Sequence, residues 1–298
     1  MIDAVLWFFT NIFNAFVNFF YAVSHPAEWL DWSNKQALMR FIYYGGSVEF
    51  FFFIFTAFLV LTGFGLWRRS IMWGAVRVME GFGNAVGRFF AWAALAMVLQ
   101  QIMIVLLQRV FRVSEISLGP FGVVFTKDLS WFAEELKFYN ALIVALCCSY
   151  TFVQGGHVRV DLFYAGVKFR TTKIIDMLGA LLFMMPAAVL TWMYAWYFMW
   201  RHLITPKVSA SDKIELLMRK ARIVKWNVET IGFSPNGFNG YFLFKVLLVA
   251  FCAMIFIQAI AFFYRSLLEF REGPESEGKY LDKDELGDVT AEAAQAAH

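Results

Sequence analysis

Residues 155–161, Gly-Gly-His-Val-Arg-Val-Asp, form the one polar, motif-like stretch in a chain of long apolar runs. An imidazole near a guanidinium and a carboxylate could bind a metal, hold a haem or move protons. Metal chemistry needs several ligands at close spacing, yet the other histidines, His25, His202 and His298, are far from His157 in sequence. No cluster of His, Cys, Asp or Glu has ligand spacing, no nucleophile stands beside a base, and no glycine-rich phosphate loop follows a strand. We therefore expect no catalytic residue, no metal and no cofactor.

The composition indicates a membrane protein. The 298 residues are 60% hydrophobic, 19% aromatic and only 16% charged, whereas soluble domains have about a quarter of their residues charged. The net charge of +3 provides no basic face for nucleic acid, so we expect the lipid bilayer and not nucleic acid as a partner. Cys147, Cys148 and Cys252 lie in apolar runs without a CxxC pair, which argues against a disulfide framework or a zinc site.

Five apolar runs come close to the roughly 20 residues that a helix needs to cross the hydrocarbon core. They are residues 50–66, 89–108, 138–154, 177–200 and 241–264. Pro186 predicts a kink in the fourth run.

A sixth candidate, residues 4–23, has the length of a span but a narrow polar stripe of Asn11, Asn14 and Asn18. It could lie flat in the interface, or it could span and press its asparagines against a partner helix. The cost of placing asparagine in lipid favours the flat arrangement.

The placement of lysine and arginine predicts the orientation. Basic residues dominate two connections, residues 67–88 and residues 155–176, so both should be cytoplasmic, and the C-terminus with them. The connections 109–137 and 201–240 then lie outside, the second despite its many basic residues, because long loops follow the rule weakly. His157 and His202 therefore fall at opposite ends of the spans and cannot share a metal or a haem.

Two segments should lie outside the membrane. Residues 212–225 predict an amphipathic surface helix that opens with a capping box formed by Asp212 and Glu215. This helix could rest on headgroups or on the spans, or its basic residues Arg219, Lys220 and Arg222 could dock a partner. The acidic composition after residue 271 predicts a disordered tail.

Two elements of the pattern identify a resemblance to a known family. Trp131, Glu134 and Glu135 precede one apolar run, and the string Gly156-His157-Val158-Arg159-Val160-Asp161 follows it. With these motifs the chain resembles the small, Q-type (DctQ-like) membrane subunit of tripartite ATP-independent periplasmic (TRAP) transporters, over about residues 88–268. Family members are usually shorter and have four spans, so residues 1–87 and the long connection 201–240 are departures.

The resemblance implies an all-α integral membrane protein with a four-helix Q-type core. We expect this core over residues 88–270, with an outer amphipathic insertion at 201–240. Residues 1–40 would form an N-terminal amphipathic or interfacial helix and an outer loop, and residues 41–87 an extra transmembrane helix and a cytoplasmic linker. Residues 271–298 would form an acidic, disordered cytoplasmic tail.

The resemblance also implies a function in the bacterial inner membrane. Such subunits are non-catalytic scaffolds for a large, elevator-type subunit, to which a periplasmic binding protein delivers organic acids. On this interpretation His157, Arg159 and Asp161 hold the geometry of a cytoplasmic loop, while Glu134 and Glu135 anchor the outer end of a helix. Two alternatives remain: a Q-type fold reused as a structural subunit of a respiratory or photosynthetic complex, and a redox subunit that binds haem or quinone.

Overall fold

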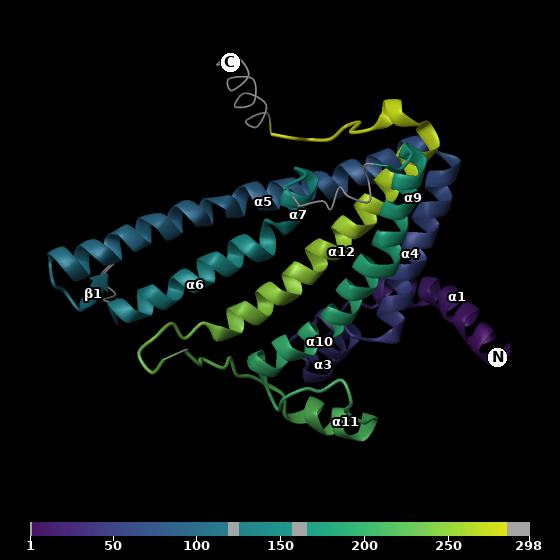
Figure 1. Cartoon of the computed structure of the whole chain (residues 1–298). Helices are drawn as coiled ribbons and strands as arrows, with labels where there is room; N and C mark the ends of the chain where they lie inside the picture. Colours follow the sequence, from purple (N-terminus) through teal and green to yellow (C-terminus); the bar gives the residue numbers. More distant parts are fainter. Residues whose placement is uncertain (1, 119–124, 157–165, 233, 285–298) are drawn as a thin grey trace, which may run out of the picture.

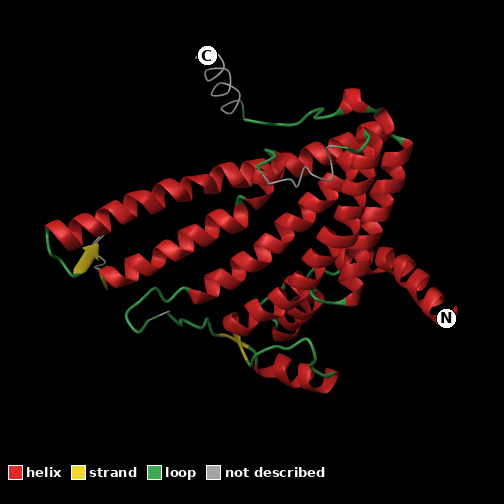
Figure 2. Ribbon diagram, viewed as in Figure 1, coloured by secondary structure: helices red, strands yellow, loops and turns green. Residues whose placement is uncertain are grey.

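The computed structural model describes residues 2–118, 125–156, 166–232 and 234–284, and these residues are mostly helical (Figures 1 and 2). Five helices are long and apolar enough to cross a membrane, which confirms the all-α membrane fold. They are α1 (Ile2–Ser24), α4 (Val48–Trp67), α5 (Arg69–Val105) continued by η1 (Leu106–Val110), α9 (Phe169–Gly179) continued by η3 (Ala180–Met184) and α10 (Met185–Leu203), and α12 (Tyr241–Glu272).

The expected span 138–154 consists of two helices, α6 (Leu129–Leu146) and α7 (Cys148–Val153), with a break at Cys147. Charged residues in the first half of α6 keep it out of the five apolar helices, while α1 qualifies. The π-helical turn η3 lies just before Pro186, the residue from which a kink is expected. Proline removes one backbone donor, and a π-turn is a common way for a helix to absorb that loss.

The expected linker between the first two spans is not a loop. Only Arg68 separates α4 from α5, and α5 with η1 runs without interruption for 42 residues. The first turns of α5 pack Met72, Trp73 and Val76 against Tyr264 and Leu268 near the end of α12. The second half of α5 then lies beside α6, which Figure 1 shows as a pair directed away from the other helices.

Helix α1 contacts the first half of α4 and runs obliquely away from the bundle (Figure 1). Its aromatic side chains meet those of α4, with Phe8 against Phe52 and Phe19 stacked on Phe53. Asn11 and Asn18 are partly buried, whereas Asn14 and most of the apolar side chains of α1 are exposed. Part of the asparagine stripe is therefore covered by the bundle.

The end of the bundle predicted to face outward is built from short elements. A buried apolar cluster joins α3 (Lys35–Tyr44) to α10 and to α11 (Ile214–Ile223). Two antiparallel pairs complete this end. The first pairs β1 (Glu115–Leu118) with β2 (Phe125–Asp128), and the second pairs β3 (Ile204–Thr205) with β4 (Lys225–Trp226). The remaining short helices are α2 (Ala27–Leu30) and η4 (Pro274–Ser276).

Two glycines allow α5 to cross α7 closely. Gly83 and Gly87 are four residues apart, so they share one face of α5, and both are buried. A Cβ at Gly87 would lie 2.1 Å from the Cβ of Tyr150, and one at Gly83 would lie 3.2 Å from the Cβ of Ser149. The thiol of Cys147 also donates to the carbonyl of Gly87 at 3.4 Å. Small residues at this spacing are typical of close helix contacts in membranes.

This crossing makes Gly87 sensitive to any side chain. We expect Gly87→Ala to lower the unfolding free energy by about 1–3 kcal/mol, because the contact atom on Tyr150 lies at the base of its side chain and cannot swing away. Gly81→Ala is the matched control, since its Cβ would meet no atom within 4 Å. Thermal unfolding in detergent measures both; a Gly87→Ala protein that melts with the control would contradict the close crossing.

Candidate functional site

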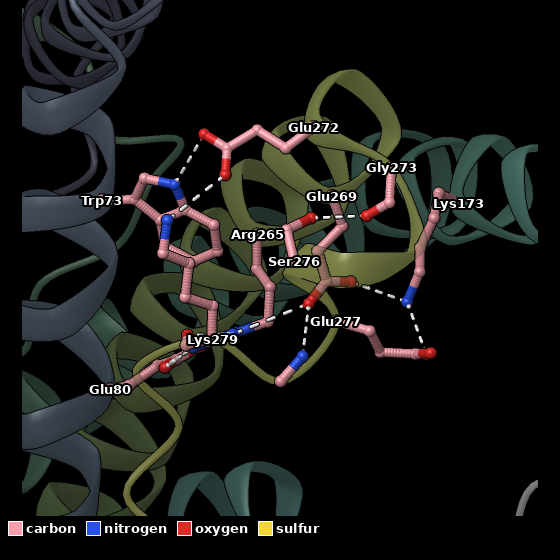
Figure 3. A network of polar contacts seen from close by, with 11 residues as sticks. Trp73, Glu80, Lys173, Arg265, Glu269, Glu272, Gly273, Ser276, Glu277 and Lys279 are labelled. Carbon is pink, nitrogen blue, oxygen red and sulfur yellow. Dashed lines mark hydrogen bonds and ion pairs between the residues drawn. The ribbon is translucent and has the colours of Figure 1, made fainter.

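Five charged side chains are buried among the described residues; one is Asp176 in α9, and the other four meet where α5, α9 and α12 join, near the C-terminal end of α12 (Figure 3). The residues of this charge cluster, with their exposed fractions, are Glu80 4%, Lys173 8%, Arg265 8% and Glu269 3%. Arg265 donates from Nε and Nη2 to the two carboxylate oxygens of Glu80, at 2.7 and 2.5 Å. Glu269 lies 3.6 Å from Arg265 Nη1 and 2.6 Å from Lys173 Nζ. The charge cluster therefore links three helices and carries no net charge.

The internal balance of the charge cluster explains how it persists in an apolar chain. Removing an ion from water costs several kcal/mol, and attraction offsets that cost only where the geometry is good and the remaining donors are bonded. Arg265 meets this condition, because its Nη1 also donates to the carbonyl of Lys279 at 3.0 Å. Its guanidinium further lies 5.5 Å from the ring centre of Trp73.

The segment after α12 covers the charge cluster. Gly273, with φ of +94°, ends α12 and turns the chain back, a conformation that glycine adopts without steric cost. The backbone N–H of Gly278 then donates to Glu269 at 3.2 Å, and Glu277 lies 3.4 Å from Lys173. We call residues 273–284 the strap. The disorder expected of the tail does not apply to the strap, while residues 285–298 lie outside the described residues.

The far end of the strap is bound by α5 and α7. Arg88 contacts Asp282 at 2.9 and 3.0 Å and Asp284 at 2.6 Å. Asn84 donates to Asp282 at 3.1 Å, and the hydroxyl of Tyr150 donates to Asp284. The hydrogen bonds from Arg88 and Asn84 lower the pKa of Asp282, and those from Tyr150 and Arg88 lower the pKa of Asp284.

The strap ends beside the start of the polar stretch described above. Gln154 exchanges hydrogen bonds with the backbone of Asp282 and Asp284, at 3.0 and 2.9 Å. Gly156 is the last described residue before the gap that contains His157, Arg159 and Asp161. Those three candidate residues therefore lie outside the described residues.

At the opposite end, Trp131, Glu134 and Glu135 lie in the first two turns of α6. Glu134 accepts from the backbone N–H of Phe238 at 3.0 Å, and Trp131 packs edge-on against the ring of Phe238. Glu135 accepts from Gln100 on α5 at 3.1 Å. Among the described residues neither carboxylate pairs with an arginine; Glu134 binds the turn before α12 and Glu135 binds α5.

The basic residues of α11 differ in their exposure. Asp212 accepts from Tyr43, from Lys220 at 2.5 Å and from the backbone of Ser209 at 3.0 Å. The expected capping box is therefore wrong, since Asp212 lies two residues before the helix begins and binds α3 instead. Lys220 is turned inward by this ion pair, whereas Arg219 and Arg222 are exposed.

The apolar face expected for α11 is only partly buried. Ala221 and Val224 belong to the core shared with α3, and Leu217 packs against it. Ile214 and Met218, expected on the same face, are 77% and 55% exposed. The helix is thus anchored along one edge and presents both apolar and basic side chains outward.

The charged groups of the cluster and the strap are engaged in holding helices together. Within the described residues, no group of three or more His, Cys, Asp or Glu side chains is arranged to hold a metal ion. Sequence reasoning had not singled out Glu80, Arg265 or Glu269. A signal was available, because Arg265 and Glu269 are four residues apart at the end of an apolar run and so share one helix face.

Comparison with known proteins gives one match. Residues 123–217 match the family model of the DctQ component of tripartite ATP-independent periplasmic transporters. The match covers about a third of the chain, from β2 to the first turn of α11, and it confirms the DctQ-like resemblance that the motifs indicated. No curated protein and no solved structure matches the chain.

Breaking the ion pair between Glu80 and Arg265 should destabilise the protein. We expect Glu80→Gln to lower the unfolding free energy by about 3–5 kcal/mol, because it leaves the Arg265 guanidinium buried without its carboxylate. The control is Glu28→Gln, whose partner Arg40 is 56% exposed, and its effect should stay within about 1 kcal/mol. Unfolding in mixed micelles measures both. Equal effects of the two substitutions would contradict a buried, energetically coupled pair.

The strap should detach in acid. Because Asp282 and Asp284 have lowered pKa values, their contribution is present above the ordinary pKa of aspartate, about 4, and is lost as the pH falls through the lowered values. A nitroxide at Lys283→Cys, with the native cysteines replaced, should be immobile at pH 7 and 5 and become mobile only as the pH falls below about 4, through the lowered pKa values of the two aspartates.

Arg88→Gln should make the same label mobile at pH 7, since it removes the cation that binds both carboxylates. Arg69→Gln is the matched control on the same helix, because Arg69 is exposed and makes no described side-chain contact with the strap. A label that is equally mobile in the parent protein and in Arg88→Gln would refute docking of the strap.

Proposed function

We propose that this chain is the non-catalytic scaffold subunit of a secondary, ion-gradient-driven TRAP transporter for organic acids. It supports a large, elevator-type membrane subunit and docks a periplasmic binding protein. The observation that carries the proposal is the DctQ match over residues 123–217. The match falls on α6, α7, α9 and α10; of these, α9 joins the charge cluster and α7 forms the glycine crossing with α5.

The pairing of the buried charges supports a role as a rigid subunit. A scaffold must hold its shape while a partner moves, and a fully paired polar network favours a single helix arrangement. Lys173 lies in α9, within the matched segment, whereas Glu80 and Arg265 lie on either side of it in sequence. The charge cluster therefore joins α9, which lies in the matched segment, to α5 and α12, which lie outside that segment.

The family-motif residues have structural roles on this proposal. Glu134 and Glu135 anchor the outer end of α6, and Trp131 packs with them. His157, Arg159 and Asp161 hold the connection between α7 and α9. Arg219 and Arg222 are the exposed candidates for contact with a soluble partner on the outer side, while Lys220 is held by Asp212.

The proposed site of action is the bacterial inner membrane, with the C-terminus in the cytoplasm. The DctQ match and the long apolar helices support a multi-pass membrane protein. Basic residues gather at the end that holds the charge cluster and the strap, which favours a cytoplasmic position for that end.

A second candidate function rests on the N-terminal part. The aromatic side chains of α1 and α4 pack against each other and leave a broad apolar surface on α1 exposed. Such a surface would suit extra contacts if the Q-type fold served as a structural subunit of another membrane complex, respiratory or photosynthetic.

Co-purification separates the two candidates. The chain, tagged and gently solubilised from its native membrane, should bring down a large, multi-span transporter subunit in a constant ratio. Reconstituted with that subunit and the binding protein, it should be needed for gradient-driven uptake of an organic acid. Recovery of a respiratory or photosynthetic complex instead, identified by mass spectrometry, would overturn the transporter proposal.

A further inference from the structure

Large apolar side chains are exposed along the pair of helices that α5 and α6 form. We call this pair the arm: the second half of α5 with η1, residues 89–110, and α6 beside it (Figure 1). Inside the arm the two helices are joined by polar contacts, with Gln100 donating to the carbonyl of Phe132 at 2.9 Å and to Glu135. Outside it, large apolar side chains such as Trp92 and Val98 are 70% and 50% exposed.

One side of the arm carries a groove of about 300 Å³. Its walls are Met97, Val98, Gln101 and Ile102 from α5 and Leu136 from α6. The groove is almost wholly apolar, because Gln101 lines it with its carbon chain. Asn140 follows Leu136 by one helical turn, so it extends the same face of α6.

Gln101 and Asn140 are polar side chains on this otherwise apolar face. Both lie in apolar runs of the sequence, residues 89–108 and 138–154, and both are exposed. Neither side-chain amide makes a hydrogen bond with any described residue, in contrast to Gln100 one position away. Lipid chains offer no donor or acceptor, whereas a partner helix does, and amide side chains are a common link between membrane helices.

We propose that this arm face binds a transmembrane helix of the large transporter subunit, with Gln101 and Asn140 forming hydrogen bonds across the interface. The groove accepts an apolar side chain of that helix, and the two amides beside it set its register. This inference rests on the proposed function for the identity of the partner, and it adds where on the chain that partner sits.

Photo-crosslinking tests the position. A benzophenone amino acid at Val98, in the full chain co-expressed with the large subunit, should give a light-dependent product with the combined mass of the two subunits. The same probe at Trp92, on another side of α5, and at Leu190, exposed on α10, should give at least fivefold less of it. A strong product from Trp92 or Leu190 and none from Val98 would overturn the proposal.

Substitution tests the two amides. Gln101→Leu with Asn140→Leu should reduce the amount of large subunit that co-purifies by at least fivefold. Thermal unfolding of the chain alone should be unchanged or improved, since leucine suits lipid better. Thr191→Val is the matched control, because Thr191 is exposed in another span but its hydroxyl already donates to the carbonyl of Ala187 at 2.8 Å.

The outcomes separate this inference from the function on which it rests. If the parent chain recovers no large subunit, the proposed function fails. If the parent chain recovers it and the double variant recovers just as much, with crosslinks from other faces, only the arm interface fails.

Discussion

The buried pair of Arg265 and Glu80 is the interaction on which one end of the helix bundle depends. It brings together α5 and α12, which are far apart in sequence, and its bidentate geometry fixes their relative rotation. Glu269 and Lys173 form a second neutral pair, which extends the charge cluster to α9. Because a lone charge here would be very unfavourable, the four residues are stable only as a set, and the strap becomes part of that set when it supplies the remaining hydrogen bonds.

Away from the charge cluster, close packing and not ion pairing holds the helices together. In lipid there is little hydrophobic force between helices, so close packing and hydrogen bonds must hold them. Gly83 and Gly87 provide that packing where α5 meets α7. Beyond the crossing α5 is supported mainly by α6 and is otherwise exposed, which leaves the arm able to present a surface to a partner. A rigid end at the charge cluster and an open arm suit the scaffold role that we propose.

Much of this could be predicted from the sequence, and the failures have physical causes. Apolar runs identify spans because the thickness of the bilayer sets their length. The predicted capping box does not form, because Asp212 binds the side chains of Tyr43 and Lys220 and not the backbone at the start of α11. The prediction of a linker at residues 67–88 is wrong, because basic residues were taken as a sign of a loop. The segment is helical and packs its apolar side chains against α12. The prediction of disorder is wrong for residues 273–284, because Arg88 of the folded bundle binds their acidic side chains. Low hydrophobicity predicts disorder only for a segment that has no such partner.

The sequence by itself determined that this is an all-α membrane protein and, through Trp131, Glu134, Glu135 and the polar stretch at 155–161, which family it resembles. These are properties of composition and local spacing. Only the tertiary structure decided which charges are buried together, that the tail folds back as a strap, and that Gln101 remains without a described partner while Gln100 has one. The reason is that pairing depends on distances between segments nearly two hundred residues apart, which local patterns do not encode.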